Sequence, residues 1–268
     1  MIQYKTFLLT GAANGIGRKL AEGLAQKGAR LLLVDIDLEG LHQAFSESDT
    51  LLLRQLDVTQ EADWERVLQE TVERFGQLDY CVNNAGVIMP GFLTETPLEH
   101  IDFHLNVNAK GVMLGTMLAA RMMVLQGQGH IINIASLAGI APIQGISLYS
   151  ASKFAVRGFG IAAHYELAAQ GIHVSVICPD LVDTAMLTTQ LQYPEESAMS
   201  FSGAAQALQV EDVERAFYRV LQKRPIEYCL PRSRGWLAKV GNAFPGLGAL
   251  LVKRLQRKGL RRAREWGA

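Results

Sequence analysis

The 268-residue chain has only three cysteines, and neither they nor its six histidines show the paired spacing of metal ligands. Cys81, Cys178 and Cys229 lie far apart in apolar runs, which predicts buried free thiols in a reducing compartment. Among the histidines, His104 is expected to be a structural imidazole with satisfied hydrogen bonds rather than a catalytic group. We therefore expect no metal centre.

The chain also lacks a run of the roughly 18 apolar residues that a membrane-spanning helix requires. Its first apolar run, Phe7–Leu9, passes directly into a glycine turn and does not have the form of a secretory signal. Basic and acidic residues balance at 26 each, and the resulting net charge of zero argues against a dedicated nucleic-acid binder. These absences predict a cytoplasmic globular protein that binds no nucleic acid.

The balanced total conceals a basic C-terminal extension, residues 231–268, in which ten lysines and arginines are opposed by Glu265 alone. If residues 246–264 form a helix, its apolar and basic side chains gather largely on opposite sides. This pattern is typical of a helix that rests peripherally on an anionic membrane. It fits equally well a helix packed against the acidic remainder of the chain or a neighbouring subunit. The apolar side consists of Leu247, Leu251, Val252 and Leu255, interrupted by Lys258 and Arg262, and the basic side of Lys253, Arg254, Arg257, Arg261 and Arg264.

Short apolar runs with β-type residues alternate with helical patterns as far as about residue 230. Several runs are apolar almost throughout, as expected of strands covered on both faces of a sheet. The alternation predicts the α/β class, with a Rossmann-type, doubly wound parallel sheet in a three-layer α/β/α arrangement. The predicted strands are Thr6–Thr10, Arg30–Asp35, Leu51–Leu56, Tyr80–Asn83, His130–Ala135, His173–Cys178 and Glu227–Leu230; the predicted helices include Gly15–Lys27, Glu61–Phe75 and Ser147–Ala169, and Thr96–Glu99 has the form of a capping box.

No repeat or linker divides residues 1–230, which we predict to be one domain. Within it, residues 184–208 form a polar insertion that carries scattered apolar side chains. Such side chains suit either the adaptable wall of a binding site or ordinary packing beneath a loop. They are Met186, Leu187, Leu191, Tyr193, Met199 and Phe201.

A glycine-rich turn, Thr10–Gly17, follows the first predicted strand and opens the first predicted helix. Its glycines allow a close approach of the backbone to a pyrophosphate, and the helix N-terminus supplies free N–H groups. Asp35 ends the second strand, where a carboxylate can accept hydrogen bonds from the adenosine ribose. Since this charge would repel a 2′-phosphate and Ile36 is no compensating arginine, the pattern favours NAD over NADP. The alternative role for Asp35 is to cap a helix over residues 37–47.

Tyr149 and Lys153 are four residues apart in a helical pattern, which brings the phenol and the ammonium to one helix face. The lysine charge would favour the phenolate and lower the pKa of the tyrosine. Ser136, thirteen residues upstream, would supply a hydroxyl that orients a substrate oxygen. Taken singly, the pair fits a solvated helix surface and the serine fits an ordinary turn.

These motifs occur in an order that resembles the short-chain dehydrogenase/reductase family, in its compact single-domain branch. The resemblance extends from Thr6 to about Leu230, and it implies that residues 1–230 are a single NAD-binding catalytic domain. One position departs from the family pattern, because Pro179 is followed by Asp180 rather than glycine, and we expect that carboxylate to face solvent. The cofactor-binding residues that the resemblance implies are Gly11, Asn14, Gly15, Ile16, Gly17, Asp35, Asp57, Val58, Asn84, Ala85, Gly86, Tyr149, Lys153, Pro179 and Thr184.

The resemblance also implies a catalytic set of Ser136, Tyr149, Lys153 and Asn108. Tyr149 would be the general base in oxidation or the general acid in reduction, while Lys153 lowers its pKa and holds the nicotinamide ribose. Asn108 would hold a water that links the lysine to solvent; alternatively, it bonds backbone groups at a helix bend. Hydride would pass between the substrate carbon and nicotinamide C4, which is chemistry that belongs to the cofactor.

The implied function is NAD-dependent hydride transfer between nicotinamide and a hydrophobic secondary alcohol or ketone. In the family the insertion after Thr184 covers the substrate, so residues 184–208 are expected to form a lid. Family members of this size are homodimers or homotetramers, and the helix that carries Tyr149 is rich in the small residues that close helix packing needs. Two alternatives stay open: a sensor or scaffold that binds NAD without turnover, and an epimerase or dehydratase that shares the YxxxK motif.

Overall fold

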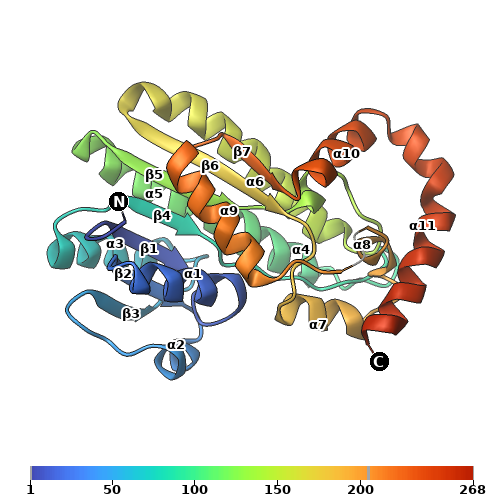
Figure 1. Ribbon diagram of the computed structural model, residues 1–268, viewed down its shortest axis with the longest axis horizontal. Coiled ribbons are helices and arrows are strands. Elements are labelled where there is room, and N and C mark those ends of the chain that lie inside the picture. Colours follow the sequence, from blue (N-terminus) through green and yellow to red (C-terminus); the bar gives the residue numbers. More distant parts are fainter. Residues whose placement is uncertain (1, 204–205, 268) are drawn as a thin grey trace.

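The computed structural model describes residues 2–203 and 206–267, without the side chains of residues 247–250, and in this part of the chain it contains one seven-stranded parallel sheet (Figure 1). The strands are β1 (Thr6–Thr10), β2 (Arg30–Asp35), β3 (Leu51–Gln55), β4 (Tyr80–Asn83), β5 (Gly129–Ile134), β6 (Ile172–Pro179) and β7 (Glu227–Leu230). Their order is β3-β2-β1-β4-β5-β6-β7, so the chain builds outward from β1 to β3 and then from β4 to β7. This confirms the predicted doubly wound Rossmann-type fold, and each strand end lies within one residue of its predicted position.

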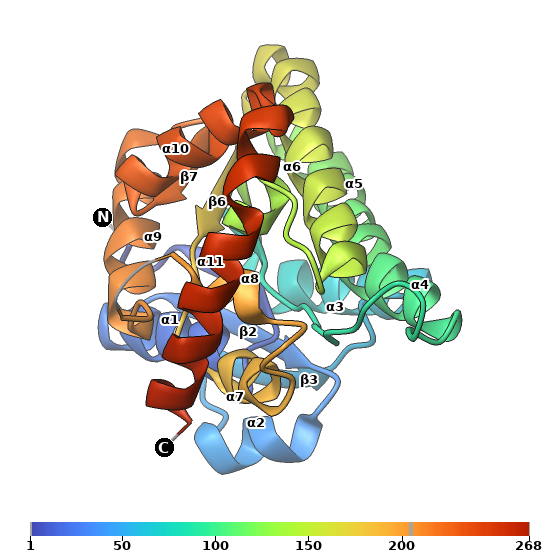
Figure 2. The same ribbon diagram turned by 90° about the vertical axis from the view of Figure 1, so that its right-hand side faces the viewer.

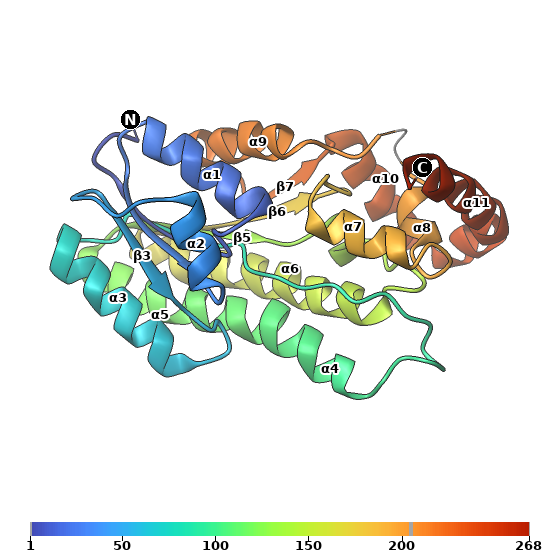
Figure 3. The same cartoon turned by 90° about the horizontal axis from the view of Figure 1, so that it is seen from below.

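Helices cover both faces of the sheet and make the three predicted layers (Figure 3). Strand β1 shows why both faces are covered. Its successive side chains point to opposite faces of the sheet, and the three central ones are all apolar. Phe7 and Leu9 pack with Phe217 on one face, and Leu8 packs with Trp64 on the other; all five are completely buried. Burying each such side chain contributes about 1.5–3 kcal/mol. The first face carries α1 (Gly15–Gln26), α2 (Leu38–Ala44) and α9 (Val210–Lys223), and the second carries α3 (Glu61–Phe75), α5 (Gly111–Gln126) and α6 (Ser147–Leu167).

The helical segment before α5 begins later than the sequence predicted. α4 (Glu99–His104) has Leu98 as its N-cap residue and no side-chain cap. Thr96 instead donates its hydroxyl to the carbonyl of Phe92 at 2.8 Å. The predicted capping box is therefore wrong, because the loop that turns at Phe92 engages the threonine. α4 continues through a π-helical turn, η1 (Leu105–Lys110), into α5.

The carboxyl ends of all the strands point to one edge of the sheet, on the right in Figure 1, because the sheet is parallel. The chain changes direction across the sheet between β1 and β4, and parallel sheets bind their ligands at such a switch point. Several short helices stand beyond this edge. They are η2 (Leu137–Gly139), α7 (Ala185–Gln192), α8 (Ala198–Phe201), α10 (Arg232–Ala243) and the longer α11 (Pro245–Trp266).

The C-terminal extension forms α10 and α11, and α11 crosses the carboxyl end of the molecule (Figure 2). Its second half packs on α8, where Gly259 lies against backbone and Ala263 is buried with Phe201. Trp266 meets Phe201 edge to face with ring centroids 5.8 Å apart. On the predicted apolar side, Leu251 is exposed and Val252 and Leu255 are half-buried, while the side chain of Leu247 lies outside the described part. No helix among residues 2–203 and 206–267 is long and apolar enough to cross a membrane.

Candidate active site

The turn after β1 is held in place by the loop that follows β4. Asn84 donates its side-chain amide to the carbonyls of Thr10 and Gly11, both at 3.0 Å. The Thr10 hydroxyl accepts the backbone N–H groups of Asn84 and Ala85, also at 3.0 Å. A Cβ at Gly17 would collide with the Gly11 carbonyl, so only glycine fits where α1 passes the turn. Of the predicted residues, Gly11, Asn14, Gly15, Ile16, Asn84, Ala85 and Gly86 line one cavity, and Gly17 packs behind it.

Asp35 stands at the end of β2, and two backbone N–H groups hold its carboxylate. Ala13 donates to Oδ2 at 2.9 Å and Asp37 donates to Oδ1 at 3.1 Å. The N-cap of α2 is Asp37, which accepts from Gly40, so the alternative that Asp35 caps this helix is wrong. Asp35 lines the cavity together with Ile36, whose side chain is 64% exposed. Its carboxylate oxygens keep lone pairs for further hydrogen bonds.

Asp57 and Val58 follow β3 and line the same cavity. The Asp57 Oδ1 accepts the backbone N–H of Thr59 at 2.9 Å and its hydroxyl at 2.8 Å. The Val58 carbonyl accepts the indole N–H of Trp64 at 3.0 Å, which ties this loop to α3. Loops after three neighbouring strands therefore converge, as the parallel sheet requires.

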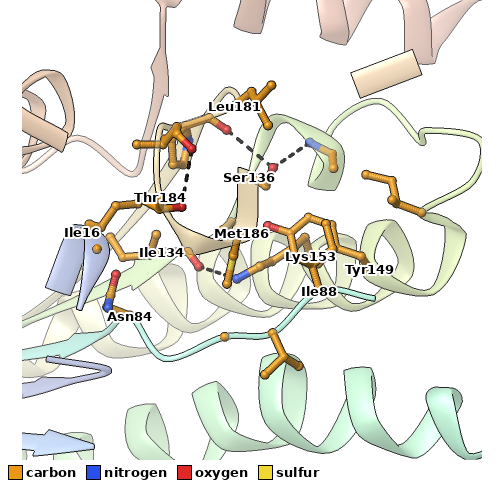
Figure 4. A pocket seen from close by; sticks show the side chains of 18 of the residues that line it. Ile16, Asn84, Ile88, Ile134, Ser136, Tyr149, Lys153, Leu181, Thr184 and Met186 are labelled. Carbon is orange, nitrogen blue, oxygen red and sulfur yellow. Dashed lines mark hydrogen bonds between the residues drawn. The ribbon is translucent and has the colours of Figure 1, made fainter. Parts of the chain in front are cut away.

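Tyr149 and Lys153 lie on the first two turns of α6 and both line the cavity (Figure 4). Ser136 caps η2 by accepting the Ala138 N–H at 3.1 Å, and its hydroxyl donates to the carbonyl of Pro179 at 3.5 Å. The Lys153 ammonium donates to the carbonyl of Ile134 at 3.0 Å and lies 5.7 Å from the centre of the Tyr149 ring. The fold thus brings the predicted serine, tyrosine and lysine together at one wall.

Burial controls the ionisation of the tyrosine and the lysine. It raises the pKa of the Tyr149 phenol to about 12, against the opposing effect of the Ser136 hydroxyl. Burial also lowers the pKa of the Lys153 ammonium to about 8. In this structure desolvation dominates the pKa of the Tyr149 phenol, and the Lys153 ammonium donates to the Ile134 carbonyl; that Lys153 lowers this pKa stays a prediction. A phenol with this pKa is a proton donor at neutral pH.

Asn108 lies in the π-helical turn η1 and is completely buried. Its amide donates to the carbonyl of Val87 at 2.9 Å and to the hydroxyl of Ser152 at 3.0 Å, and its Oδ1 accepts the Val87 N–H at 2.7 Å. Both amide hydrogens are used, so the side chain does what the alternative prediction described: it bonds backbone at a helix bend. A relay water would have to use backbone carbonyls of this turn or the remaining lone pair of Oδ1.

His104 holds the same loop from α4. Its Nε2 accepts the Met89 N–H at 3.0 Å, while Nδ1 lies 2.7 Å from the His100 carbonyl and donates to it. The prediction of a satisfied structural imidazole is confirmed, and desolvation lowers the pKa of this buried side chain. Asn108 and His104 together fix the loop on both sides of Ile88, which lines the cavity and packs in one cluster with Tyr149.

The cavity has a volume of about 760 Å³, and most of its lining around Tyr149 is apolar. Sequence reasoning missed Ile88, although its place two residues after the Asn-Asn-Ala-Gly motif was a usable signal. It also missed Leu237 of α10, for which the chain offered no local signal. The insertion divides between its two expected roles: Met186 and Met199 line the cavity, whereas others pack with α11. The packed side chains are Leu187, Leu191 and Phe201.

Pro179 and Thr184 bring the loop after β6 to the start of α1. Both line the cavity, and Thr184 is the N-cap residue of α7. Its methyl group lies 3.3 Å from the position of a Cβ on Gly15. A larger residue at Gly15 would therefore press on this loop, in addition to the strain of its positive φ of 53°.

Asp180 does not face solvent as predicted. Its carboxylate pairs with Arg234 of α10, and its side chain is only 12% exposed. The prediction is wrong because α10 starts directly after β7, the neighbour of β6, which places Arg234 over the end of β6. Both members of the ion pair line the cavity.

A protein-family model described as short chain dehydrogenase matches residues 5–194. The chain belongs to the short chain dehydrogenase family. One relative, the 3-alpha-(or 20-beta)-hydroxysteroid dehydrogenase of Mycobacterium tuberculosis, is 38% identical over 183 residues, which are 68% of this chain and 70% of that protein. Another, the 2-(R)-hydroxypropyl-CoM dehydrogenase of Xanthobacter autotrophicus, is 34% identical over 196 residues, 70% of this chain and 78% of that protein. A short chain dehydrogenase/reductase of Burkholderia phymatum, solved in complex with NAD, has a TM-score of 0.80 at 26% identity and covers 92% of this chain and 96% of its own.

This short-chain dehydrogenase is therefore an oxidoreductase of a family that uses nicotinamide cofactors. Its cavity fits a dinucleotide. The N-terminus of α1 opens into the cavity at Asn14, whose side chain caps no backbone N–H, so those donors are free for a phosphate. The carboxylate of Asp35 lies in the same cavity and accepts the backbone N–H of Ala13 in the turn before α1.

Proposed function

We propose that this short-chain dehydrogenase transfers hydride between NAD(H) and a hydrophobic secondary alcohol or ketone, with Tyr149 as the general acid/base. The observation that carries the proposal is the position of Tyr149, which lines one largely apolar cavity together with Ser136, Lys153 and the glycine turn. A volume of about 760 Å³ is that of a small-molecule site.

The dinucleotide would lie along the carboxyl ends of the first strands. The N-terminus of α1 suits the pyrophosphate, and Asp35 suits the hydroxyls of the adenosine ribose. Lys153 and Thr184 stand toward the catalytic wall, where they would hold the nicotinamide end. Ile36 offers no positive charge to a 2′-phosphate, which favours NAD over NADP. The cofactor, when bound, supplies or accepts the hydride.

Proton transfer would belong to Tyr149. Because its pKa of about 12 keeps the phenol protonated at neutral pH, it is ready to protonate the oxygen of a ketone. Ser136 would hold that oxygen in line with the phenol. Lys153, with a pKa of about 8, is mostly charged at pH 7 and would stabilise the phenolate that remains. The free enzyme near neutrality therefore has the protonation state that the reduction of a ketone requires.

The walls of the cavity indicate a hydrophobic substrate. Ile88, Ile143 and Met186 surround the space next to Tyr149, and Met199 and Leu181 close it from the side of the insertion. Methionine side chains adapt to irregular ligands, so such a wall accepts rings as well as chains. A relative named as a hydroxysteroid dehydrogenase agrees with a substrate of this class.

The enzyme is expected to be a homodimer or homotetramer that pairs through α5 and α6. Their outer face carries Met117 and Leu125, which are 48% and 90% exposed, and a Cβ on Gly158 would meet no atom within 4 Å among the described residues. A flat surface of small and apolar side chains allows two copies of these helices to approach closely. Light scattering of the purified chain would measure its mass.

The decisive experiment compares Tyr149→Phe with Tyr165→Phe, a control on the same helix whose side chain is 68% exposed. Both proteins should bind NADH with unchanged affinity, measured by its fluorescence. Only Tyr149→Phe should lose turnover, by about 10²–10⁴-fold, in NADH oxidation with ketones of graded chain length and ring size.

Full turnover by Tyr149→Phe would remove the proposed mechanism. A wild-type protein that binds NADH but reduces none of the ketones would instead support the alternative of an NAD-binding sensor or scaffold.

A further inference from the structure

We propose that α10 and the first half of α11 dock on an anionic lipid membrane, so that the mouth of the cavity faces the bilayer. Only the purpose of this docking rests on the proposed function: it would let a hydrophobic substrate enter the cavity directly from the lipid. The docking itself follows from the exposed side chains, the charge and the placement of this surface.

The first observation is a group of large apolar side chains that the fold leaves exposed. Trp236 and Leu237 of α10 are 69% and 62% exposed, and Phe244 at the junction of the two helices is 59% exposed. Leu251 in the first half of α11 is 51% exposed. Several large apolar side chains left exposed on two adjoining helices mark an interaction surface, and tryptophan is enriched at the boundary of a membrane.

The second observation is the charge that surrounds these side chains. Lys253 and Arg254 are exposed at the end of the first half of α11 and Arg257 is exposed one turn later, and Glu265 is the only acidic residue of the whole extension. Each basic residue close to an anionic membrane surface contributes about 1 kcal/mol. Apolar anchors framed by several such charges satisfy both requirements of an interfacial helix.

The third observation is that α11 is held in a defined orientation. Its second half is fastened to α8, where Arg262 donates to the carbonyls of Phe201 and Gly203 at 2.9 and 3.1 Å. Ala263 is buried in that contact. At the middle of the helix Gln256 donates to Gln144 at 3.1 Å, and the neighbouring basic side chains of Lys253, Arg254 and Arg257 are exposed. The C-terminal part of α11 is thus fixed to α8, and the part before it is exposed to solvent.

The fourth observation connects this surface to the cavity. Leu237 lines the cavity although it is 62% exposed, so it stands at the mouth. Phe103 of α4 does the same on another side and is 39% exposed. Near it, Leu93 and Leu98 are 70% and 80% exposed, on a segment that lies at the same end of the molecule as α11 (Figure 3). An apolar rim on both sides of a cavity mouth favours a bilayer over a protein partner that contacts α11 alone.

Co-sedimentation with vesicles tests the proposal without cofactor or substrate, so its outcome is independent of the proposed function. The wild-type chain should bind vesicles rich in phosphatidylglycerol, bind phosphatidylcholine vesicles at least about tenfold more weakly, and lose affinity as salt rises.

Two double variants with reversed charges test whether vesicle binding depends on the proposed surface or only on the net charge of the protein. Arg254→Glu with Arg257→Glu should reduce binding to anionic vesicles by about tenfold or more. Lys27→Glu with Lys223→Glu, at the C-terminal ends of α1 and α9 and hence at the opposite edge of the sheet, should leave it unchanged. Trp236→Ala should weaken binding at high salt, where the apolar contribution dominates.

Equal binding to both lipids, or equal loss in the two reversed pairs, would overturn the proposal. The proposal would also be overturned if the wild-type protein did not bind vesicles and the Arg254/Arg257 double variant had a different oligomeric mass in solution. That result would assign the surface to contact with a second copy of the chain. Circular dichroism of each variant would verify that it is folded.

Discussion

Asp180, at the end of β6, forms an ion pair with Arg234 of α10 inside the cavity wall. Asp180 stands where the family usually has glycine, and Arg234 belongs to the C-terminal extension that follows the family domain. The ion pair therefore connects these two features. The Asp180 side chain is 12% exposed and the Arg234 side chain 32%, so solvent screens the pair only in part. The aspartate is therefore accommodated in the cavity wall because α10 supplies the arginine that pairs with it.

Breaking this pair should cost stability. We expect Arg234→Ala to lower the free energy of unfolding by about 1–3 kcal/mol, because it leaves a largely buried carboxylate without its partner. Asp180→Gly with Arg234→Ala should cost less than the sum of the single changes. Urea unfolding measures each value, and Arg18→Ala, which removes an exposed i,i+4 pair with Glu22, is the control at well under about 1 kcal/mol. Additive effects would show that the pair is not coupled.

The pH dependence of ketone reduction should follow the ionisation of the Lys153 ammonium. Its pKa of about 8 means that the ammonium is present below pH 8 and is lost as the pH rises through that value. The phenol of Tyr149 stays protonated throughout this range, since its pKa is about 12. We therefore expect kcat/KM with NADH to fall on the alkaline side with an apparent pKa near 8. A profile that is flat to pH 10 would contradict the role of the lysine charge.

Cofactor preference should depend on Asp35. A carboxylate beside the 2′-phosphate of NADPH is expected to make NADH the better cofactor by about 100-fold or more in kcat/KM, equivalent to roughly 2.7 kcal/mol. Asp35→Ala combined with Ile36→Arg should narrow or reverse that ratio. Asp37→Ala removes a nearby carboxylate that caps α2, and it should leave the ratio unchanged. Equal use of both cofactors by the wild-type enzyme would refute this assignment.

The three thiols should react at different rates. Cys178 and Cys229 are directly opposite on β6 and β7, and the hydrogen bond from Cys178 lowers the pKa of Cys229 while it raises that of Cys178. Burial raises the pKa of Cys81 to about 12. Iodoacetamide at pH 8 should therefore modify Cys229 first, as peptide mapping would show. Faster labelling of Cys81 would be the opposite result.

Acid should destabilise the fold through His130. Burial lowers the pKa of this imidazole to about 3, whereas it is near 6.5 in an unfolded chain. The folded state then binds fewer protons between pH 6.5 and 3, so stability is lost as the pH falls through this window, by up to about 1.4 kcal/mol per pH unit. His130→Gln should flatten that slope in urea unfolding. His42→Gln, at an exposed position, should keep it.

The surroundings of His130 do not offer a compensating negative charge. Its Nε2 donates to the Ser175 hydroxyl at 2.9 Å, and that hydroxyl donates in turn to the carbonyl of Pro225 at 2.6 Å. The charged and titratable groups that act on it are Arg224, His164 and His173, and each lowers its pKa. An unchanged pH slope in His130→Gln would mean that another group accounts for acid sensitivity.

The parts of the site that the sequence predicted are those set by short-range geometry. Tyr149 and Lys153 share a face because a helix brings residues four apart together. The turn from Thr10 to Gly17 required glycine because the backbone passes so closely that a Cβ at Gly17 has no room. The apolar runs of the strands likewise predicted the sheet, since a strand covered on both faces has no polar positions.

The parts that sequence reasoning missed depend on segments that are distant along the chain. Asp180 meets Arg234 only because β6 and β7 are neighbours in the sheet. The sequence left open whether α11 packs on the rest of the chain, because Gly259 permits a close backbone contact with α8 that no hydrophobic pattern indicates. Asn108 was assigned either a water or backbone bonds, and the tertiary structure gives its amide hydrogens to the carbonyl of Val87 and the hydroxyl of Ser152.

By itself, the amino-acid sequence determined the order of strands and helices, the glycine turn and the pairing of Tyr149 with Lys153, because periodicity and steric exclusion act over a few residues. The tertiary structure alone decided the ionisation of that pair, because a pKa depends on how completely remote segments exclude water from it. It also decided which side of the basic extension is packed and which is presented, because that choice follows from contact with α8 rather than from the helix pattern.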